Sequence, residues 1–297
     1  MSYLFGPVPS RRYGRSLGID LVPMKTCCYD CLFCQLGSTQ QTTCVRRDYV
    51  PIADVLTALS AWLAKGEPVD ILTLCGSGEP TLHAHFGTVL RWIRDYTEKP
   101  SLLMSNGALF ADPMVREEAQ VASRVKWSLH FWDEASFQTI VRPEASLRFA
   151  AIYKGWQLFR ETFEGLLDIE FFALPGLNTS SEQLNKVMAL IEALHPHSVT
   201  VNTAERPPAE VSVEKVTAAE LERLRKLFAT IAPSESAQNT MEAEPYSEGA
   251  LLELARRHPL TPAQFARYFG QSEALITEAL LRLAVTDSYA ARALAPH

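Results

Sequence analysis

The chain has 297 residues, of which 47% are hydrophobic and 21% are charged, so it has a globular composition that excludes disordered and fibrous classes. Its formal net charge of −6 gives no general attraction to nucleic acid or to anionic membranes. No run of about 18 apolar residues predicts a membrane helix, and the N-terminus lacks a signal-peptide pattern. We therefore expect a cytoplasmic protein that has no membrane partner.

The first two thirds of the chain alternate short apolar, β-rich runs with helical patterns. The predicted strands are Ser16–Val22, Asp70–Cys75, Ser101–Met104, Arg124–Leu129, Leu167–Phe172 and Ser198–Asn202. The predicted helices are Ile52–Ala64, Phe86–Tyr96, Pro113–Ala122, Leu147–Thr162 and Ser181–Leu194. This alternation indicates a parallel sheet with crossover helices. Six units are too few for an eight-unit barrel. The predicted fold is therefore α/β, a partial (β/α)6 TIM-like barrel.

The remaining third of the chain has a different pattern. Thr217 opens a helix, residues 233–245 form a polar linker, and three short amphipathic helices follow. These helices are Glu248–Arg257, Pro262–Phe269 and Glu273–Ala284. A threonine cap before the second helix and a glycine after it indicate a small all-α helix-turn-helix domain, winged-helix-like. We expect a core over residues 1–207, a helix and linker over 208–246, and a small helical domain over 247–297.

The charge of the last segment bears on its partner. Residues 247–297 contain five Asp or Glu and five Arg, so their formal charges cancel. A domain that neutralises several phosphates should be clearly positive. We therefore expect this segment to contact protein or to act as a lid, and we consider DNA an unlikely partner.

Three cysteines directly after the first predicted strand are the strongest chemical signal. Cys27, Cys31 and Cys34 have a C-x3-C-x2-C spacing. A disulfide framework fits badly, because neighbouring cysteines close no long loop. Three thiolates can hold one face of a 4Fe–4S cluster and leave one iron without a protein ligand. The alternative is a zinc site completed by Cys28, Cys44 or a histidine. Cys44 and Cys75 are also consistent with ordinary small core residues.

A glycine-rich turn follows the second predicted strand. It consists of Gly76, Ser77, Gly78, Glu79 and Pro80. Glycines let the backbone approach a ligand closely, and a carboxylate pairs with a cation. Further polar residues follow the next strands: Ser105 and Asn106, then Ser128 and His130, then Asn178 in a Pro-Gly-x-Asn turn.

The order and spacing of these motifs resemble the radical S-adenosylmethionine (radical SAM) superfamily over roughly residues 10–205. The resemblance implies that Cys27, Cys31 and Cys34 hold a 4Fe–4S cluster. It implies that this cluster cleaves S-adenosylmethionine reductively, giving a 5′-deoxyadenosyl radical that abstracts hydrogen from a substrate. It also implies a set of residues that bind S-adenosylmethionine: Phe33, Gly78, Glu79, Pro80, Ser105, Asn106, Ser128, His130 and Asn178. His130 departs from the aspartate of many relatives, which is consistent with substrate specificity or with a structural histidine.

The first residues resemble a subgroup similar to the wyosine-tRNA synthases. Those enzymes carry a second cluster on three cysteines upstream of the first, whereas no cysteine precedes Cys27 here. The resemblance implies an electron donor of the flavodoxin or ferredoxin type. A small molecule, a peptide and a tRNA all stay open as substrates. The alternatives for function are an iron–sulfur electron-transfer protein without S-adenosylmethionine cleavage and a tRNA-modifying radical SAM enzyme.

Several arginines are candidates for contact with an anionic substrate or ligand. Five lie near the first strand and the cysteines: Arg11, Arg12, Arg15, Arg46 and Arg47. Two more, Arg142 and Arg206, follow the fourth and sixth predicted strands. The alternative for the first five is a solvated basic surface.

Overall fold

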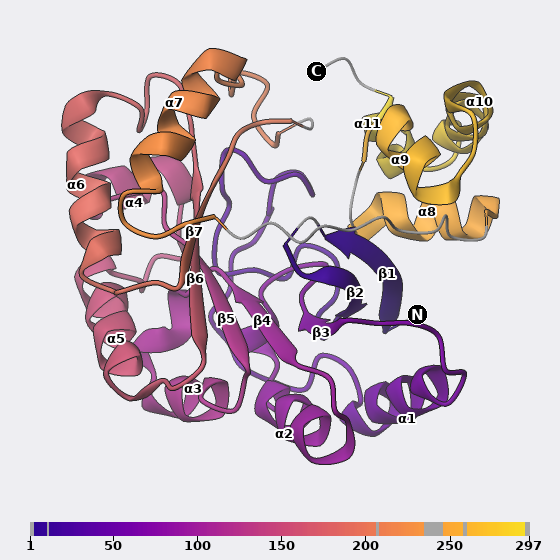
Figure 1. The fold of residues 1–297 in the computed structure, drawn as a ribbon, viewed down its shortest axis with the longest axis horizontal. Helices are drawn as coiled ribbons and strands as arrows, with labels where there is room; N and C mark the ends of the chain where they lie inside the picture. Colours follow the sequence, from indigo (N-terminus) through magenta and orange to yellow (C-terminus); the bar gives the residue numbers. More distant parts are fainter. Residues whose placement is uncertain (1–2, 11, 206–207, 235–245, 258–259, 295–297) are drawn as a thin grey trace.

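The computed structural model describes residues 3–10, 12–205, 208–234, 246–257 and 260–294. Within this part of the chain, seven strands form one curved sheet in the order of the sequence (Figure 1). The strands are β1 (Leu4–Ser10), β2 (Gly14–Ile19), β3 (Ile71–Leu74), β4 (Ser101–Ser105), β5 (Arg124–Ser128), β6 (Leu166–Phe172) and β7 (Ser198–Asn202). Neighbouring strands from β2 to β7 are parallel, which confirms the partial barrel.

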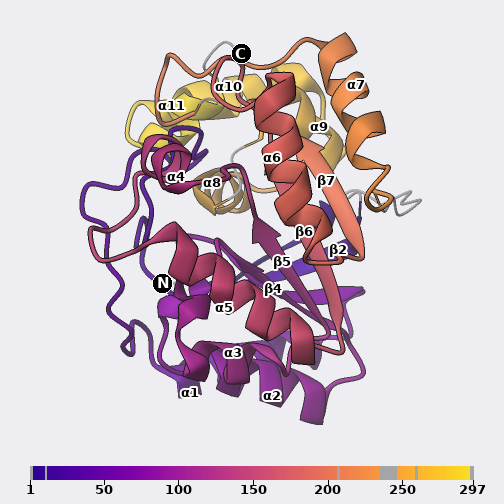
Figure 2. The same ribbon diagram turned by 90° about the vertical axis from the view of Figure 1, so that its left-hand side faces the viewer.

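Helices cover the outer face of this sheet (Figures 1 and 2). The core helices are α1 (Ile52–Leu63), α2 (Phe86–Tyr96), α3 (Pro113–Ala119), α4 (Glu134–Val141), α5 (Phe149–Thr162), α6 (Ser181–Glu192) and α7 (Ala218–Phe228). Two short 3-10 helices are η1 (Pro80–Leu82) and η2 (Ala108–Ala111). The chain continues into α8 (Glu248–Arg257), α9 (Pro262–Phe269), α10 (Glu273–Ala284) and α11 (Ser288–Ala293).

The hydrophobic pattern explains why these elements form. In α2 the buried residues Phe86, Val89, Leu90 and Ile93 recur every three or four positions and form one apolar stripe. All four residues of β3 are buried, as expected for a strand covered on both faces. The ring of Trp127 from β5 stacks on that of Trp156 from α5, with ring centroids 5.0 Å apart. The outer helices and the sheet therefore share one core.

The sequence analysis missed β1. This strand is antiparallel to β2 and lies at the edge of the sheet. Pro7 and Pro9 weaken its strand pattern, and prolines are tolerated chiefly at such edges because they cannot donate to a ladder. The same analysis missed α4, which begins with a capping box between Asp133 and Ser136, and α11.

The three predicted C-terminal helices are confirmed with their predicted bounds as α8, α9 and α10. Thr261 caps α9, and Gly270 ends it in the left-handed conformation. The described residues from 246 to 294 contain helices and no strand, so only the helical part of the winged-helix expectation is observed. The predicted linker lies outside the described residues from position 235 to 245.

The C-terminal helices cover the exposed edge of β1. Phe5 and Val8 of β1 belong to the same apolar cluster as Phe265 and Phe269 of α9. The hydroxyl of Tyr268 donates to the carbonyl oxygen of Pro7 at 2.8 Å. Covering an edge strand in this way prevents it from pairing with another chain. No helix in the described part of the chain is both long and apolar enough to cross a bilayer.

Candidate functional site

The three motif cysteines lie on one loop that follows β2. Cys27, Cys31 and Cys34 are free and half-buried. The amide of Cys34 donates to the carbonyl of Cys31 at 3.1 Å, which forms a tight turn between them. The loop is fixed to α4, because the amide of Leu32 donates to the carbonyl of Ile140 at 3.1 Å. The helix that the sequence analysis missed therefore positions the cysteines.

Polar groups approach two of these thiols. The ammonium of Lys25 lies 3.1 Å from Sγ of Cys34, and Nδ2 of Asn106 lies 3.4 Å from Sγ of Cys27. Burial raises the pKa of the Cys27 thiol to about 12, and the Glu79 carboxylate adds to this shift. Burial also raises the pKa of Cys31. Both thiols are therefore protonated in the metal-free chain, and a metal that binds them must displace their protons.

This donor set fits a cluster better than a single ion. Among the described residues, no three His, Cys, Asp or Glu side chains converge as the ligands of one ion would. Zinc needs four ligands around one point, whereas each cysteine of a 4Fe–4S cluster binds a different iron. The Cys28 thiol is buried and forms a hydrogen bond with the Cys44 thiol instead. The residues present thus fit an iron–sulfur cluster held by three cysteines.

The glycine-rich turn packs directly against the cysteine loop. A Cβ atom on Gly78 would lie 1.9 Å from the carbonyl oxygen of Thr26, so only glycine fits at this position. The amide of Glu79 donates to the same oxygen at 3.0 Å, and the amide of Lys25 donates to the carbonyl of Ser77 at 2.7 Å. The turn and the residues just before Cys27 therefore form one unit.

The carboxylate of Asp20 fixes Ser77 within the turn. The buried carboxylate of Asp20 accepts hydrogen bonds from the amide of Ser77 at 3.1 Å and from its hydroxyl. Asp20 directly follows β2, and the sequence analysis missed it. A carboxylate at the carboxyl end of a predicted inner strand was the available signal.

The Glu79 carboxylate joins the turn to the loop after β4. It is 2% exposed and accepts four hydrogen bonds. Oε1 accepts from the amide and hydroxyl of Thr81, at 3.0 and 2.6 Å, and from the hydroxyl of Ser105 at 2.8 Å. Oε2 accepts from the amide of Asn106 at 2.7 Å. Burial raises the pKa of Glu79, although these hydrogen bonds act in the opposite direction. Through Asn106, the carboxylate is linked to Cys27.

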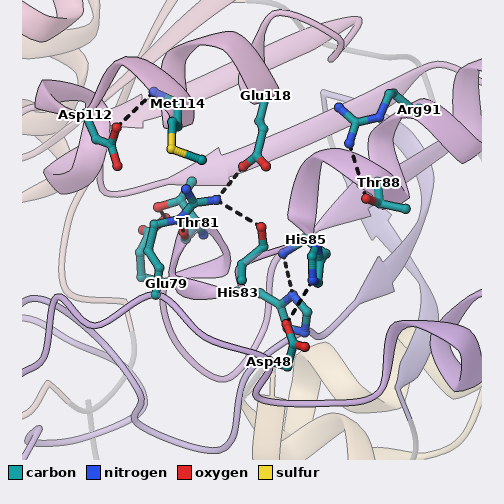
Figure 3. Close-up of polar contacts among 12 residues, drawn as sticks. Asp48, Glu79, Thr81, His83, His85, Thr88, Arg91, Asp112, Met114 and Glu118 are labelled. Atoms are coloured by element: carbon teal, nitrogen blue, oxygen red, sulfur yellow. Dashed lines mark hydrogen bonds and ion pairs between the residues drawn. The ribbon is translucent and has the colours of Figure 1, made fainter.

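Charged residues contact the turn and the residues that directly follow it (Figure 3). Arg46 forms an ion pair with Glu118 and donates to the carbonyl of Thr81 at 3.1 Å. Beside it, His85 lies 3.3 Å from the Asp48 carboxylate, and the amide of His85 donates to Nδ1 of His83 at 3.0 Å. The Arg46 guanidinium is therefore engaged by Glu118 and by the backbone next to the turn.

The other candidate arginines divide by location. Arg15 is paired with Asp70 at 3.2 Å, and Arg142 with Glu210 at 2.6 Å. Arg47 lies over the ring of Tyr49, and Arg11 and Arg206 fall outside the described residues. Among these candidates, Arg12 lines the interior of the barrel.

That interior contains a cavity of about 530 Å³. Phe33 and Cys34 from the cysteine loop, Ser128 at the end of β5 and Gly76 of the turn all line it. The ring of Phe33 stacks on that of Phe172 at 4.4 Å between centroids. Three of the predicted site residues thus face one cavity. Glu79 is buried and does not line this cavity, and Pro80 is buried at the start of η1.

The side chains of Asn178 and His130 form hydrogen bonds with the backbone of Phe172. The side-chain nitrogen Nδ2 of Asn178 donates to the backbone carbonyls of His130 at 3.1 Å and of Phe172 at 2.9 Å. Its side-chain oxygen Oδ1 accepts from the backbone amide of Leu174 at 2.7 Å. Nδ1 of His130 accepts from the amide of Phe172 at 2.8 Å. Both side chains therefore hold the loops after β5 and β6 together, which favours the structural interpretation of His130.

The buried imidazole of His130 is expected to make the free energy of unfolding depend on pH. Burial lowers its pKa from 6.5 to about 4, while nearby Glu170 and Lys126 act in opposite directions. Above pH 6.5 the ring is neutral in both states, so its contribution is complete. As the pH falls from there to about 4, only the unfolded chain gains the proton, and the free energy of unfolding falls by about 3 kcal/mol. Denaturant titrations across this range should show a flatter profile for His130→Gln. The exposed control His195→Gln should keep the wild-type slope, and an unchanged slope in His130→Gln contradicts the assignment.

Comparison with known proteins shows the family. No protein-family model matches the sequence. A UPF0026 protein of Synechocystis is 37% identical over 206 residues, which cover 69% of this chain and 76% of that protein. A protein of Brachyspira hyodysenteriae named GTPase Obg is 30% identical over 286 residues, 94% of this chain but only 42% of that protein. This chain thus spans less than half of that relative. The P-loop that binds nucleotide phosphates contains a Gly-Lys pair, and this sequence contains no such pair.

Solved structures show the fold. A radical SAM methyltransferase from Sphaerobacter thermophilus aligns with a TM-score of 0.54 and 16% identity, over 74% of this chain and 65% of that one. SuiB of Streptococcus suis, solved with bound S-adenosylmethionine, aligns with a TM-score of 0.57 and 17% identity, over 86% of this chain and 56% of that one. The chain belongs to the UPF0026 family and has the fold of the radical SAM enzymes.

Proposed function

We propose that this protein is a radical SAM enzyme in which Cys27, Cys31 and Cys34 hold a 4Fe–4S cluster. The observation that carries the proposal is the fastening of the Gly78–Glu79 turn to the cysteine loop. Thr26 contacts both residues of the turn, and Asn106 connects Glu79 to Cys27. A site for a cationic amino acid group beside an iron with an open position needs these two segments together.

When bound, the cluster supplies the electron that cleaves S-adenosylmethionine, and the resulting 5′-deoxyadenosyl radical abstracts hydrogen from the substrate. The chain's own residues prepare the site for this chemistry. The ammonium of Lys25 beside Cys34 and the amide of Asn106 beside Cys27 offset negative charge on the sulfurs. Phe33 and the cavity wall exclude water from a reactive intermediate.

Glu79 and its neighbours would bind the methionyl part of S-adenosylmethionine. The buried carboxylate attracts an ammonium group, and Gly76 and Gly78 let the backbone approach it. Pro80 and Ser105 would maintain the shape of the turn. Ser128 faces the cavity, where it can donate to ligand oxygens. His130 and Asn178 would act indirectly, by holding Phe172.

One solved structure supports S-adenosylmethionine as the ligand. SuiB carries it in the solved structure, and its fold aligns over most of this chain. Separately, the match to the Brachyspira hyodysenteriae protein covers 94% of this chain, so it continues into the C-terminal helical segment. We propose the division into residues 1–207, 208–246 and 247–297 for the whole protein. A flavodoxin- or ferredoxin-type protein would supply single electrons.

Anaerobic reconstitution tests the proposal. The purified chain is loaded with iron and sulfide, reduced, and mixed with S-adenosylmethionine. We expect about four irons per chain, together with methionine and 5′-deoxyadenosine as products. A chain that incorporates and reduces a cluster but forms no 5′-deoxyadenosine would instead be an iron–sulfur electron-transfer protein.

A further inference from the structure

The turn between β1 and β2 closes the barrel at the end opposite the cysteines. The hydroxyl oxygen of Ser10 accepts from the amides of Arg12 at 3.3 Å and Tyr13 at 3.1 Å, which fixes the turn. The Tyr13 hydroxyl donates to the Asp168 carboxylate at 2.9 Å. Asp168 is also paired with Arg124 at 3.0 Å, and both side chains are almost fully buried. This end of the barrel is therefore sealed and its charges are neutralised.

One layer nearer the cysteines, a second group of polar residues lines the cavity. We call Arg12, Lys126, Glu170 and Asn202 the cavity floor. Lys126 is paired with Glu170 at 2.7 Å, and the amide of Asn202 donates to Glu170 at 2.8 Å. Burial alone would raise the pKa of Glu170, but Lys126, with smaller contributions from Arg12 and His130, outweighs it and lowers that pKa to about 2. Lys126 and Glu170 therefore neutralise each other.

Arg12 differs from every other charge of the floor. Its guanidinium donates a 3.4 Å hydrogen bond from Nη2 to the neutral side-chain oxygen of Asn202. No carboxylate of the described residues forms an ion pair with its guanidinium. Glu205, the other carboxylate of the cavity lining, is exposed. The half-buried guanidinium lies close enough to Glu170 to lower the pKa of that carboxyl, but it forms no ion pair with it, so its remaining donors are free to bind an anion in the cavity.

We propose that Arg12 forms a substrate subsite that binds an anionic group, a carboxylate or a phosphate. A guanidinium matches both groups with two parallel hydrogen bonds, and Asn202 and Lys126 supply further donors beside it. The cavity volume lies in the usual range for small-molecule sites, roughly 300–1,000 Å³. The occupant is a small anionic molecule, or the anionic end of a larger one. This inference rests on the proposed function for its role in catalysis.

The backbone of Arg12 lies at the end of β2 that is opposite the cysteine loop. Arg12 precedes the amino end of β2, whereas the cysteine loop follows its carboxyl end, and six strand residues at about 3.3 Å each lie between them. The guanidinium itself reaches Asn202, the last residue of β7, and Cys34 lines the same cavity. A substrate held by Arg12 would therefore share this cavity with S-adenosylmethionine.

Binding of simple anions tests the subsite without the cluster. Inorganic phosphate and malonate are titrated by calorimetry into the full chain, free of metal and of S-adenosylmethionine, at low salt. We expect saturable binding that Arg12→Met weakens by about tenfold or more, because a charge-assisted pair is lost. Arg47→Met removes the same charge from outside the cavity and should bind like the wild type. Arg12→Lys should bind with intermediate affinity. Thermal unfolding confirms that each variant is folded.

Three results would overturn the proposal. They are the absence of saturable binding to the wild type, equal binding by Arg12→Met, and an equal loss in Arg47→Met. A fourth measurement uses the reconstituted protein: Arg12→Met should retain S-adenosylmethionine binding, and its loss would assign Arg12 to that ligand's carboxylate instead. Failure of the proposed function appears elsewhere, as wild-type protein that forms no 5′-deoxyadenosine.

Discussion

Cys31→Ser is expected to abolish cluster binding and to lower 5′-deoxyadenosine formation by more than about 100-fold. This loss is larger than the loss of about 10- to 100-fold that follows when a hydrogen-bond partner of a metal ligand is removed. Cys31 lies between the other two motif cysteines on a loop fixed to α4, and its thiol is one of the three proposed cluster ligands. A serine hydroxyl is a hard ligand that iron–sulfur clusters rarely use. Iron and sulfide per chain and the visible absorption after reconstitution measure the loss.

Cys44→Ser is the matched control for this variant. Cys44 is half-buried, and its thiol forms a hydrogen bond with the Cys28 thiol. We expect this variant to keep the cluster and the cleavage reaction. If Cys44→Ser loses the metal and Cys31→Ser retains it, the ligand set is a different one and the zinc alternative is revived.

The parallel part of the fold could be predicted because each strand and helix carries its own local pattern. The strand Ser198–Asn202 and the helix Phe86–Tyr96 were predicted with their observed bounds, since the strand alternates polar and apolar residues and the helix carries one apolar stripe. β1 could not be predicted in this way. Its two prolines fit only an edge, and its partner for burial is α9, more than 250 residues away.

The candidate site could likewise be predicted only in part. The cysteines and the Gly78–Glu79 turn are local motifs, and the parallel topology brings both to one end of the sheet. The partners Asp20 and Lys25 were not predicted, because their contacts depend on how the two loops fold against each other. The same holds for Arg12, which is one arginine among five in the sequence; unlike Arg15, Arg46 and Arg47, it lines the cavity.

Gly78→Ala is expected to have the second large effect, because the added methyl group would clash with backbone on the cysteine loop. The new Cβ would lie 1.9 Å from the oxygen and 2.7 Å from the carbon of the Thr26 carbonyl. A peptide group cannot rotate away as a flexible side chain can, so either the turn or the loop must shift. Overpacking of this kind costs about 1–3 kcal/mol of folding free energy.

The shift would reach the chemistry, because Thr26 directly precedes Cys27 and the neighbouring Glu79 is tied to Asn106. A displacement near 1 Å can cost about 100-fold in rate, so we expect a comparable loss of 5′-deoxyadenosine formation even where the cluster is retained. Gly249→Ala on α8 is the control. Its nearest neighbour would be 3.9 Å away, and alanine should stabilise the helix by up to about 1 kcal/mol. Wild-type stability and cleavage in Gly78→Ala would show that the turn does not need to contact the cysteine loop, and the coupling on which the proposed site depends would be wrong.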